Sequence, residues 1–202
     1  MPLLLLPDAT LYSLPGSGPF HFRSCAGYTE ACGDWLVFSG EDGCFLKNPF
    51  SNATVTLPPL SRVRFQHVGT THVKVRYLVE SRGALLLVCR MINLRLESSF
   101  EVYEANFEQS QWAKVTTLGD DQVLFLCRQC CRSVSISYND MPGDRIFFMD
   151  ANEECYLFYS QEASSSCRAY DMRDGKVSTP LPMVSWKPGK VFATWLLPTC
   201  LN

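Results

Sequence analysis

A repeated strand–turn–strand pattern constrains the fold of this chain more than any other feature. In its first copy, residues 25–60, an apolar strand at 35–38 is followed by a polar turn and a second strand at 44–47. An Asn48-Pro49 break, a third short strand and the segment L-P-P-L then close the copy. Strands separated by a glycine-containing turn and a proline break are typical of one antiparallel sheet.

The pattern returns twice, and a short tail at residues 11–16 fits the end of an earlier copy. The leucines that end successive copies lie 43, 61 and 63 residues apart. One blade of a β-propeller takes about 40–50 residues, so the chain has room for about four blades. We therefore predict that residues 1–202 form a single, partial β-propeller domain. It should be all-β, with antiparallel blades in an incomplete ring; a β-sandwich is the alternative.

Short apolar runs rich in Val, Phe, Tyr and Leu, separated by Gly, Asp, Asn, Pro and Ser, predict strands rather than amphipathic helices. Thirteen candidate strands follow from these runs, and almost no helix is expected. They are residues 35–38, 44–47, 54–57, 73–79, 84–89, 100–104, 112–116, 123–127, 133–137, 145–150, 156–159, 167–171 and 176–179.

The composition describes a folded chain and argues against two classes of partner. Hydrophobic residues make up 47% of the chain and charged residues 19%, which is typical of a globular protein. The net charge is −2 and the basic residues are scattered, so neither nucleic acid nor an anionic membrane is an expected partner. The leucine run at 3–6 is too short for an export signal, and no run approaches the ~18 apolar residues of a membrane span. We expect a cytoplasmic or nuclear protein.

Ten cysteines are spread along the chain. Several, such as Cys89 and Cys127, stand inside apolar strands, where cysteine behaves as a small buried hydrophobic residue. We therefore expect reduced thiols rather than disulfides. The nearest approach to a metal motif is Cys127-x-x-Cys130-Cys131. A structural zinc normally takes two such pairs, and because the sequence has no second pair, neither a metal nor another cofactor is expected.

The sequence predicts no catalytic site. The nucleophile-elbow, phosphate-loop, dinucleotide-binding and H-E-x-x-H motifs do not occur in it. Neighbouring acids are interpreted as solvated turns, and so is a calcium-loop opening in which a cysteine replaces the required glycine. The residues weighed and set aside are Asp120, Asp121, Asp150, Ala151, Asn152, Glu153, Glu154, Cys155, His21, His67 and His72.

Four tryptophans are candidates for aromatic contacts. Trp35 and Trp112 stand inside predicted strands and are expected to pack in the core. Trp186 and Trp195 stand near proline residues and are the better candidates for exposure. No partner-binding face follows from the residues, and two functions stay open: a non-enzymatic protein-interaction propeller, and a small-molecule-binding or hydrolytic propeller.

Several motifs occur in the order found in one plant family. They are C-x-G followed by W-L-V (25–37), E-D-G (41–43), N-P-F-S (48–51), L-P-P-L (57–60), Y-L-V-E-S-R-G-x-L-L-L-V (77–88), F-x-V-Y (100–103), W-x-x-V-x-x-L-G-D (112–120) and Y-D-M-x-D-G (170–175). Together they make the chain resemble the KIB-type, kelch-like β-propeller domain, which in plants usually follows an F-box.

The resemblance implies a substrate-recognition role in a Skp1–cullin–F-box ubiquitin ligase, in which the propeller captures an unknown target protein. No F-box pattern is recognised in the sequence, so we expect the chain by itself not to bind the Skp1-type adaptor. The stretch between L-P-P-L and Y-L-V-E-S-R-G is reduced to residues 61–76, which indicates a shortened family member, complete or vestigial. We expect its incomplete ring to expose apolar residues at 3–6 and 195–197, and to self-associate or depend on a partner.

Overall fold

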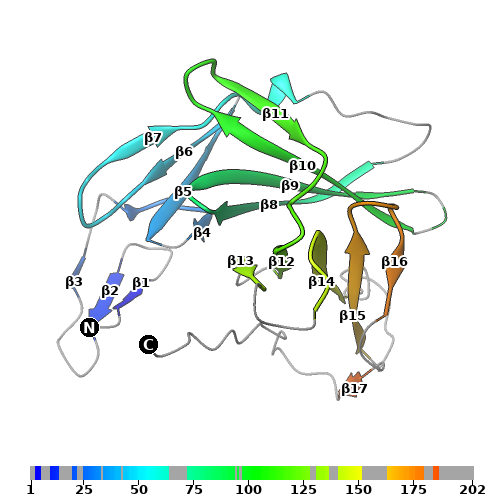
Figure 1. Ribbon diagram of the computed structural model, residues 1–202. Helices are drawn as coiled ribbons and strands as arrows, with labels where there is room; N and C mark the ends of the chain where they lie inside the picture. The colour runs from blue at the N-terminus through cyan, green and yellow to red at the C-terminus, as the bar shows by residue number, and fades with distance from the viewer. Residues whose placement is uncertain are drawn as a thin grey trace. The chain divides into compact units, whose positions relative to one another are not determined.

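The chain divides into two compact units. The first comprises residues 1–64 and 105–113, and the second comprises residues 65–104 and 114–202. The computed structural model (Figure 1) describes residues 3–5, 10–13, 20–21, 25–32, 34–41, 43–63, 72–93, 95, 97–127, 131–136, 141–151, 163–179 and 184–186.

The first unit contains two antiparallel sheets. One has three strands, in the order β1 (Leu3–Leu5), β2 (Thr10–Ser13) and β3 (Phe20–His21). The other has four strands in chain order: β4 (Glu30–Cys32), β5 (Trp35–Gly40), β6 (Gly43–Lys47) and β7 (Thr54–Thr56). A short 3-10 turn, η2 (Leu60–Arg62), follows the L-P-P-L segment.

The L-P-P-L segment is held by hydrogen bonds inside the first unit. The indole Nε1–H of Trp112 donates to the carbonyl oxygen of Pro58 at 2.9 Å. Nearby, Arg62 Nη1 donates to the carbonyl oxygen of Ser110 at 3.1 Å. Trp112 is buried, as predicted, whereas Trp35 is only half-buried. These bonds fix the direction in which the chain leaves β7.

Two further sheets follow. A four-stranded antiparallel sheet has the order β11-β10-β9-β8, formed by β8 (His72–Ser81), β9 (Ala84–Ile92), β10 (Ser98–Asn106) and β11 (Gln111–Val115). A six-stranded sheet has the order β13-β12-β14-β15-β16, with β17 also paired to β15. Its strands are β12 (Gln122–Leu126), β13 (Arg132–Ser135), β14 (Arg145–Ala151), β15 (Ala163–Asp171), β16 (Val177–Ser178) and β17 (Val184–Trp186).

One strand pair departs from the antiparallel pattern that the sequence predicts. β12 and β14 are parallel, with Val123 opposite Arg145 and Phe125 opposite Phe147. The reason is the path of the chain: β13 returns along one side of β12, and the next strand is then laid down on the other side of β12, in the direction of β12. The six-stranded sheet therefore has two strands that begin at the same end.

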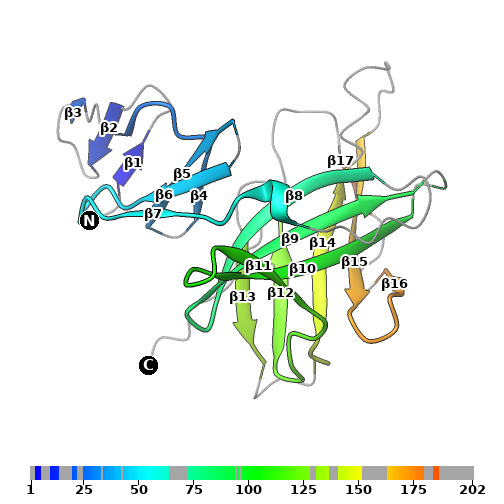
Figure 2. The ribbon, with the colours of Figure 1, turned by 90° about the horizontal axis from the view of Figure 1, so that it is seen from above.

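The core of the second unit lies between its two sheets. Buried side chains of β8, β9 and β10 meet those of β12, β14 and β15, because alternate residues of a strand share one face. Figure 2 shows the strands of the two sheets crossing one another. The ring of Phe100 lies 4.8 Å from that of Phe148 and 5.2 Å from that of Tyr170. The core members are Tyr77, Val79, Leu86, Val88, Phe100, Val102, Leu124, Leu126, Ile146, Phe148 and Tyr170.

The prediction of an all-β chain with about four sheet units is confirmed. Twelve of the thirteen predicted strands lie on strands of the structure, and the other, residues 156–159, lies outside the described residues. The strands β1 to β4 and β17 were not predicted. Within the described part of the chain no sheet closes on itself, which fits an incomplete ring.

Candidate functional site

Loops of the second unit meet at one end of its two sheets. β12 and β14 begin at this end and β15 ends there, because β14 is parallel to β12 and antiparallel to β15. The turn between β8 and β9 reaches the same place, since its Arg82 forms an ion pair with Asp121 in the loop before β12.

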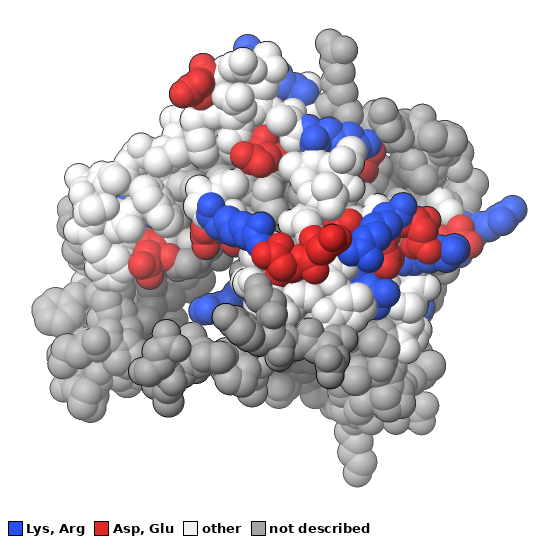
Figure 3. All heavy atoms as spheres, viewed as in Figure 1, with Lys and Arg blue, Asp and Glu red and all other residues white. Residues whose placement is uncertain are grey.

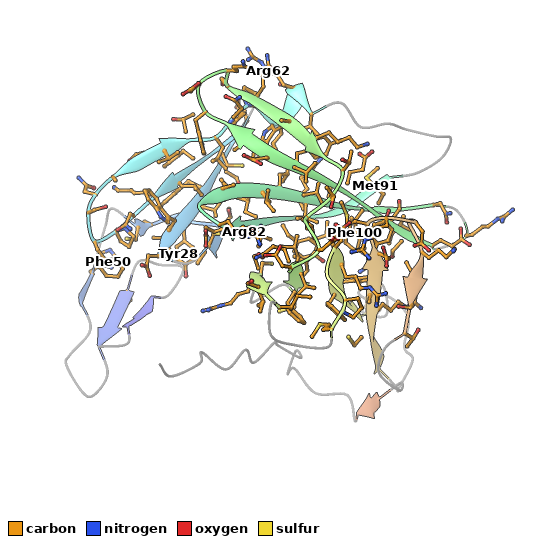
Figure 4. The ribbon with its side chains drawn as sticks, viewed as in Figure 1. Tyr28, Phe50, Arg62, Arg82, Met91 and Phe100 are labelled. Carbon is orange, nitrogen blue, oxygen red and sulfur yellow. The ribbon has the colours of Figure 1, made fainter. Side chains whose placement is uncertain are left out.

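We call this surface the charged edge. Acidic and basic side chains alternate in a band across the view in Figure 3, and Figure 4 marks Arg82 beside the turn that joins β8 to β9. The charged edge consists of the side chains of Arg82, Asp120, Asp121, Asp144, Arg145, Asp171, Arg173, Asp174 and Lys176.

A buried carboxylate, Asp144, holds the loops of the charged edge together. Asp144 is only 2% exposed. Its Oδ1 accepts a hydrogen bond from the backbone N–H of Leu118 at 2.7 Å, and its Oδ2 accepts one from Thr117 Oγ1 at 3.0 Å. Arg173 Nε lies 3.7 Å from Oδ2 and supplies the opposite charge that a buried carboxylate requires.

The backbone around Asp144 makes the same connection. Its N–H donates to the carbonyl oxygen of Gln122 at 2.8 Å, and its carbonyl oxygen accepts from the N–H of Met172 at 3.0 Å. The preceding residue, Gly143, packs so closely that an added Cβ would lie 2.1 Å from the carbonyl oxygen of Asp120. Only glycine allows this approach, so the loops before β12 and β14 are locked together.

The exposed charges of the edge form separate ion pairs. Arg173 Nη2 lies 2.7 Å from Asp120 Oδ1, and Arg145 Nε lies 3.3 Å from Asp171 Oδ2. Lys176 Nζ lies 2.9 Å from Asp174 Oδ2; hydrogen bonds from Lys176 lower the pKa of the Asp174 carboxyl, and that carboxylate raises the pKa of Lys176. Exposed pairs of this kind add little stability. A partner can therefore replace them at little energetic cost.

A polar side-chain network continues from the charged edge toward β13. One orientation of the Gln122 amide makes hydrogen bonds to both neighbouring side chains. In it the amide nitrogen donates to Ser133 Oγ at 2.7 Å, and the amide oxygen accepts from Arg82 Nε at 2.9 Å. Ser133 Oγ also lies 2.7 Å from Ser81 Oγ. Arg82 is therefore anchored at its Nε while its outer Nη2 pairs with Asp121.

The acids and cysteines that the sequence singled out do not form a catalytic or metal site among the described residues. Asp120 and Asp121 lie in an exposed loop, as predicted, but each pairs with an arginine. Cys127 is buried, and Cys131 Sγ donates to its carbonyl oxygen at 3.2 Å; Cys130 lies outside the described residues. Among the residues that the structure describes, no group of three or more His, Cys, Asp or Glu side chains could hold a metal ion.

The remaining candidates give no site. Seven cysteines are described, and none of these seven is in a disulfide: Cys25, Cys32, Cys44, Cys89, Cys127, Cys131 and Cys167. His21 is exposed on β3. The side chains of His67, His72, Asp150, Ala151, Asn152, Glu153, Glu154, Cys155, Trp186 and Trp195 lie outside the description.

Sequence reasoning missed the residues that organise the charged edge. Gly143 and Asp144 stand in the motif M-P-G-D-R, and Arg82 stands in S-R-G. Both motifs have the glycine that marks a turn, and that signal could have located the loops. It could not have shown that one aspartate of these turns is buried.

Comparison with known proteins assigns the family. The chain matches the KIB1-4 β-propeller family over residues 62–172, more than half of its length. It is 24% identical to F-box only protein 7 of Arabidopsis thaliana over 151 residues, which cover 75% of this chain and 33% of that protein. The chain thus spans about a third of the length of this relative. In the described part of the chain, no helix is both long and apolar enough to cross a membrane. The family match and the four sheets together show that this chain belongs to the KIB1-4 β-propeller family.

Proposed function

We propose that this chain is a non-enzymatic protein-binding β-propeller whose charged edge contacts the partner protein. The observation that carries the proposal is the preorganised set of exposed charges around buried Asp144. Loops at the ends of rigid strands are where β proteins commonly place their binding residues. A surface of alternating charge selects a partner with complementary charges and discourages others.

The exposure of the charges supports a contact role. The side chains of Arg82 and Arg173 are 53% and 50% exposed, and that of Asp120 is 93% exposed. The backbone beside Asp120 and Arg173 is held by the contacts of Gly143 and Asp144, and the side chain of Arg82 is held at its Nε by Gln122. Little further ordering of these residues is therefore needed when a partner binds. The same mixture of signs makes nucleic acid and anionic membrane poor partners, because acids stand beside every arginine of the edge.

The finer proposal is target recognition in a Skp1–cullin–F-box ubiquitin ligase. Its support is the family and the name of the Arabidopsis relative, an F-box protein. In such a ligase the F-box docks the Skp1-type adaptor and the propeller captures the target. We therefore expect the 202-residue chain alone to give a blank pull-down with purified adaptor.

A small-molecule-binding or hydrolytic propeller is the competing function. Hydrolysis needs a general acid or base at the site, most often a histidine or an acid, whereas the acids described at the charged edge pair with arginine or lysine. The geometry therefore favours binding over chemistry.

The experiment compares two arginines at opposite ends of β9. Arg82 precedes this strand at the charged edge, and Arg95 follows it on an exposed turn. Arg82→Glu and Arg95→Glu change the net charge equally. Each variant and the wild type are immobilised and incubated with extract of the source tissue, and bound proteins are quantified by mass spectrometry. The proposal expects a protein that binds the wild type and Arg95→Glu but not Arg82→Glu; equal binding to all three would reject the charged edge as the contact.

A further inference from the structure

The outer strand of the four-stranded sheet in the first unit, β7, has a free edge in the part of the chain that the structure describes. Among the described strands, the sheet order β4-β5-β6-β7 leaves one side of β7 without a neighbour (Figure 1). Its register places Thr54 opposite Lys47, Val55 opposite Leu46 and Thr56 opposite Phe45. The backbone groups on the outer side of β7 are therefore determined by the hydrogen bonds that β7 makes with β6.

Two backbone hydrogen bonds at the ends of the β6–β7 ladder show which residues face outward. Asn48 N–H donates to the carbonyl oxygen of Ala53 at 2.9 Å, and Leu57 N–H donates to that of Cys44 at 3.0 Å. Hydrogen-bonded and non-bonded pairs alternate along an antiparallel ladder. Ala53, Val55 and Leu57 thus bond toward β6, whereas the N–H and C=O groups of Thr54 and Thr56 point away from it.

The chemistry of this edge leaves it open to another strand. The side chains of Thr54 and Thr56 are both exposed, and all three residues of β7 are β-branched. Natural sheet edges are usually protected by lysine, proline or a bulge. None of these occurs within β7, whose register with β6 is regular; the first proline, Pro58, comes after the strand.

We propose that β7 pairs with β7 of a second copy of this chain, antiparallel and about a two-fold axis. In that register Thr54 lies opposite Thr56 of the second copy, and Val55 lies opposite its counterpart. The outward groups of the two threonines in each copy then make four backbone hydrogen bonds. The arrangement is isologous, as expected for a closed dimer.

The edge is chemically matched to itself, which favours a second copy over an unrelated strand. Threonine would meet threonine and valine would meet valine, and both are favourable cross-strand pairs. No charged side chain stands in β7, so the self-pair brings no like charges together. One strand inward, Phe45 stacks on Phe38 with ring centres 4.8 Å apart and stays 38% exposed, so the joined sheet also has apolar surface beside the junction.

The junction is short, so the dimer should be weak and reversible. Each copy contributes the three residues of β7, far less than the interface of a permanent dimer. Phe50, which is 68% exposed on the turn between β6 and β7 (Figure 4), lies just beyond the paired residues and can add apolar contact at either end of the junction. We expect dimer formation to rise with protein concentration.

Sedimentation equilibrium of the full chain, from micromolar to near-millimolar concentration, tests the proposal. The wild type should show a reversible monomer–dimer equilibrium. The double variant Thr54→Lys/Thr56→Lys should stay monomeric, because the introduced ammonium groups would face one another across the junction. The matched control Thr54→Val/Thr56→Val keeps every backbone group and the β-branched shape, and should dimerise like the wild type.

A charge-swap mixture tests the register and does not depend on how stable one variant is. The Lys/Lys variant mixed with Thr54→Glu/Thr56→Glu should form a heterodimer, while each alone stays monomeric. A wild type that is monomeric at all concentrations would overturn the proposal, even if it bound an unrelated β-strand peptide. So would a Lys/Lys variant that still dimerises, or a mixture that forms no heterodimer.

Discussion

The charged edge of the second unit and the outer edge of β7 in the first unit satisfy their polar groups in opposite ways. At the charged edge, buried Asp144 accepts hydrogen bonds from two loop residues, and the exposed charges pair with one another. At β7, the backbone groups of Thr54 and Thr56 point outward, and no charge stands within the strand. A partner of the charged edge must replace existing ion pairs, whereas a partner of β7 has to supply only backbone hydrogen bonds.

Because of this difference, we expect binding at the two edges to respond differently to added salt. Exposed charges are screened over about 8 Å at physiological ionic strength, so added salt should weaken binding at the charged edge. Hydrogen bonds between backbone groups involve no net charge and should respond much less. We therefore expect that a substitution can abolish binding at one edge and leave the other unchanged.

The largest expected effect on stability comes from a substitution in the core of the second unit. Phe148 is fully buried, and the guanidinium of Arg90 lies 4.7 Å from its ring centre. Phe148→Ala removes these contacts and leaves a cavity, so the free energy of unfolding should fall by about 3–5 kcal/mol. Urea unfolding measures the loss. The matched change Phe45→Ala removes a ring that is 38% exposed and should cost less than half as much; equal costs would contradict the assignment of the core.

A somewhat smaller loss is expected at Asp144. Asp144→Ala leaves the N–H of Leu118 and the hydroxyl of Thr117 without their buried acceptor, so the free energy of unfolding should fall by about 3 kcal/mol. Asp144→Asn keeps an acceptor oxygen and tolerates the backbone φ of 60°, so it should lose less. Thermal unfolding compares the two. An Asp144→Ala variant that unfolds like the wild type would contradict the role of Asp144 in holding the loops. A variant that stays folded but no longer dimerises through β7 would contradict the separation of the two edges.

Alkaline pH tests the second unit through buried Cys89. Burial is the main cause that raises the pKa of the Cys89 thiol from 9.0 to about 12. The unfolded chain therefore loses this proton first, and the stability it contributes is complete below pH 9.0 and falls as pH rises toward about 12. We expect a loss of about 1 kcal/mol at about pH 10. No threonine of β7 titrates in this range, so the dimer should be unaffected.

Urea unfolding on either side of the thiol's ordinary pKa measures this loss, and Cys89→Ala should remove part of it. Some slope should remain in the variant, because burial also raises the pKa of Tyr103 and Tyr170 in the same unit. A variant whose stability falls as steeply as that of the wild type would mean that Cys89 is not the group that titrates.

The fold was predictable where the sequence pattern is strong and local. The run at 84–89 predicts β9 because it is apolar and bounded by a glycine turn. The strands β1, β3 and β4 have only two or three residues, too few to show a period, and were missed. The parallel pairing of β12 with β14 could not be predicted either, because it depends on where the chain passes after β13 and not on the residues of either strand.

The charged edge was less predictable than the fold. Asp144 stands between glycine and arginine in a turn motif, the usual context of a solvated aspartate. Its burial arises only when the loops before β12 and β14 and the turn after β15 converge, which is a property of the sheet order. The outward direction of Thr54 and Thr56 likewise follows from the ladder register, and a three-residue strand gives no sequence signal for it.

The smallest effect on stability is expected at Arg82, where the effect on binding should be largest. Arg82 and its partner Asp121 are 53% and 45% exposed, and exposed ion pairs contribute about 0–1 kcal/mol. Arg82→Ala also removes the hydrogen bond from Arg82 Nε to Gln122, which contributes about 1 kcal/mol, so the urea midpoint should fall far less than for Phe148→Ala or Asp144→Ala. If the charged edge is the binding surface proposed above, the same variant should lose partner binding, and added salt should weaken what remains. Thr54→Lys/Thr56→Lys should do the reverse and keep the partner while losing the dimer. A variant that lost both properties at once would show that the two edges form one surface rather than two.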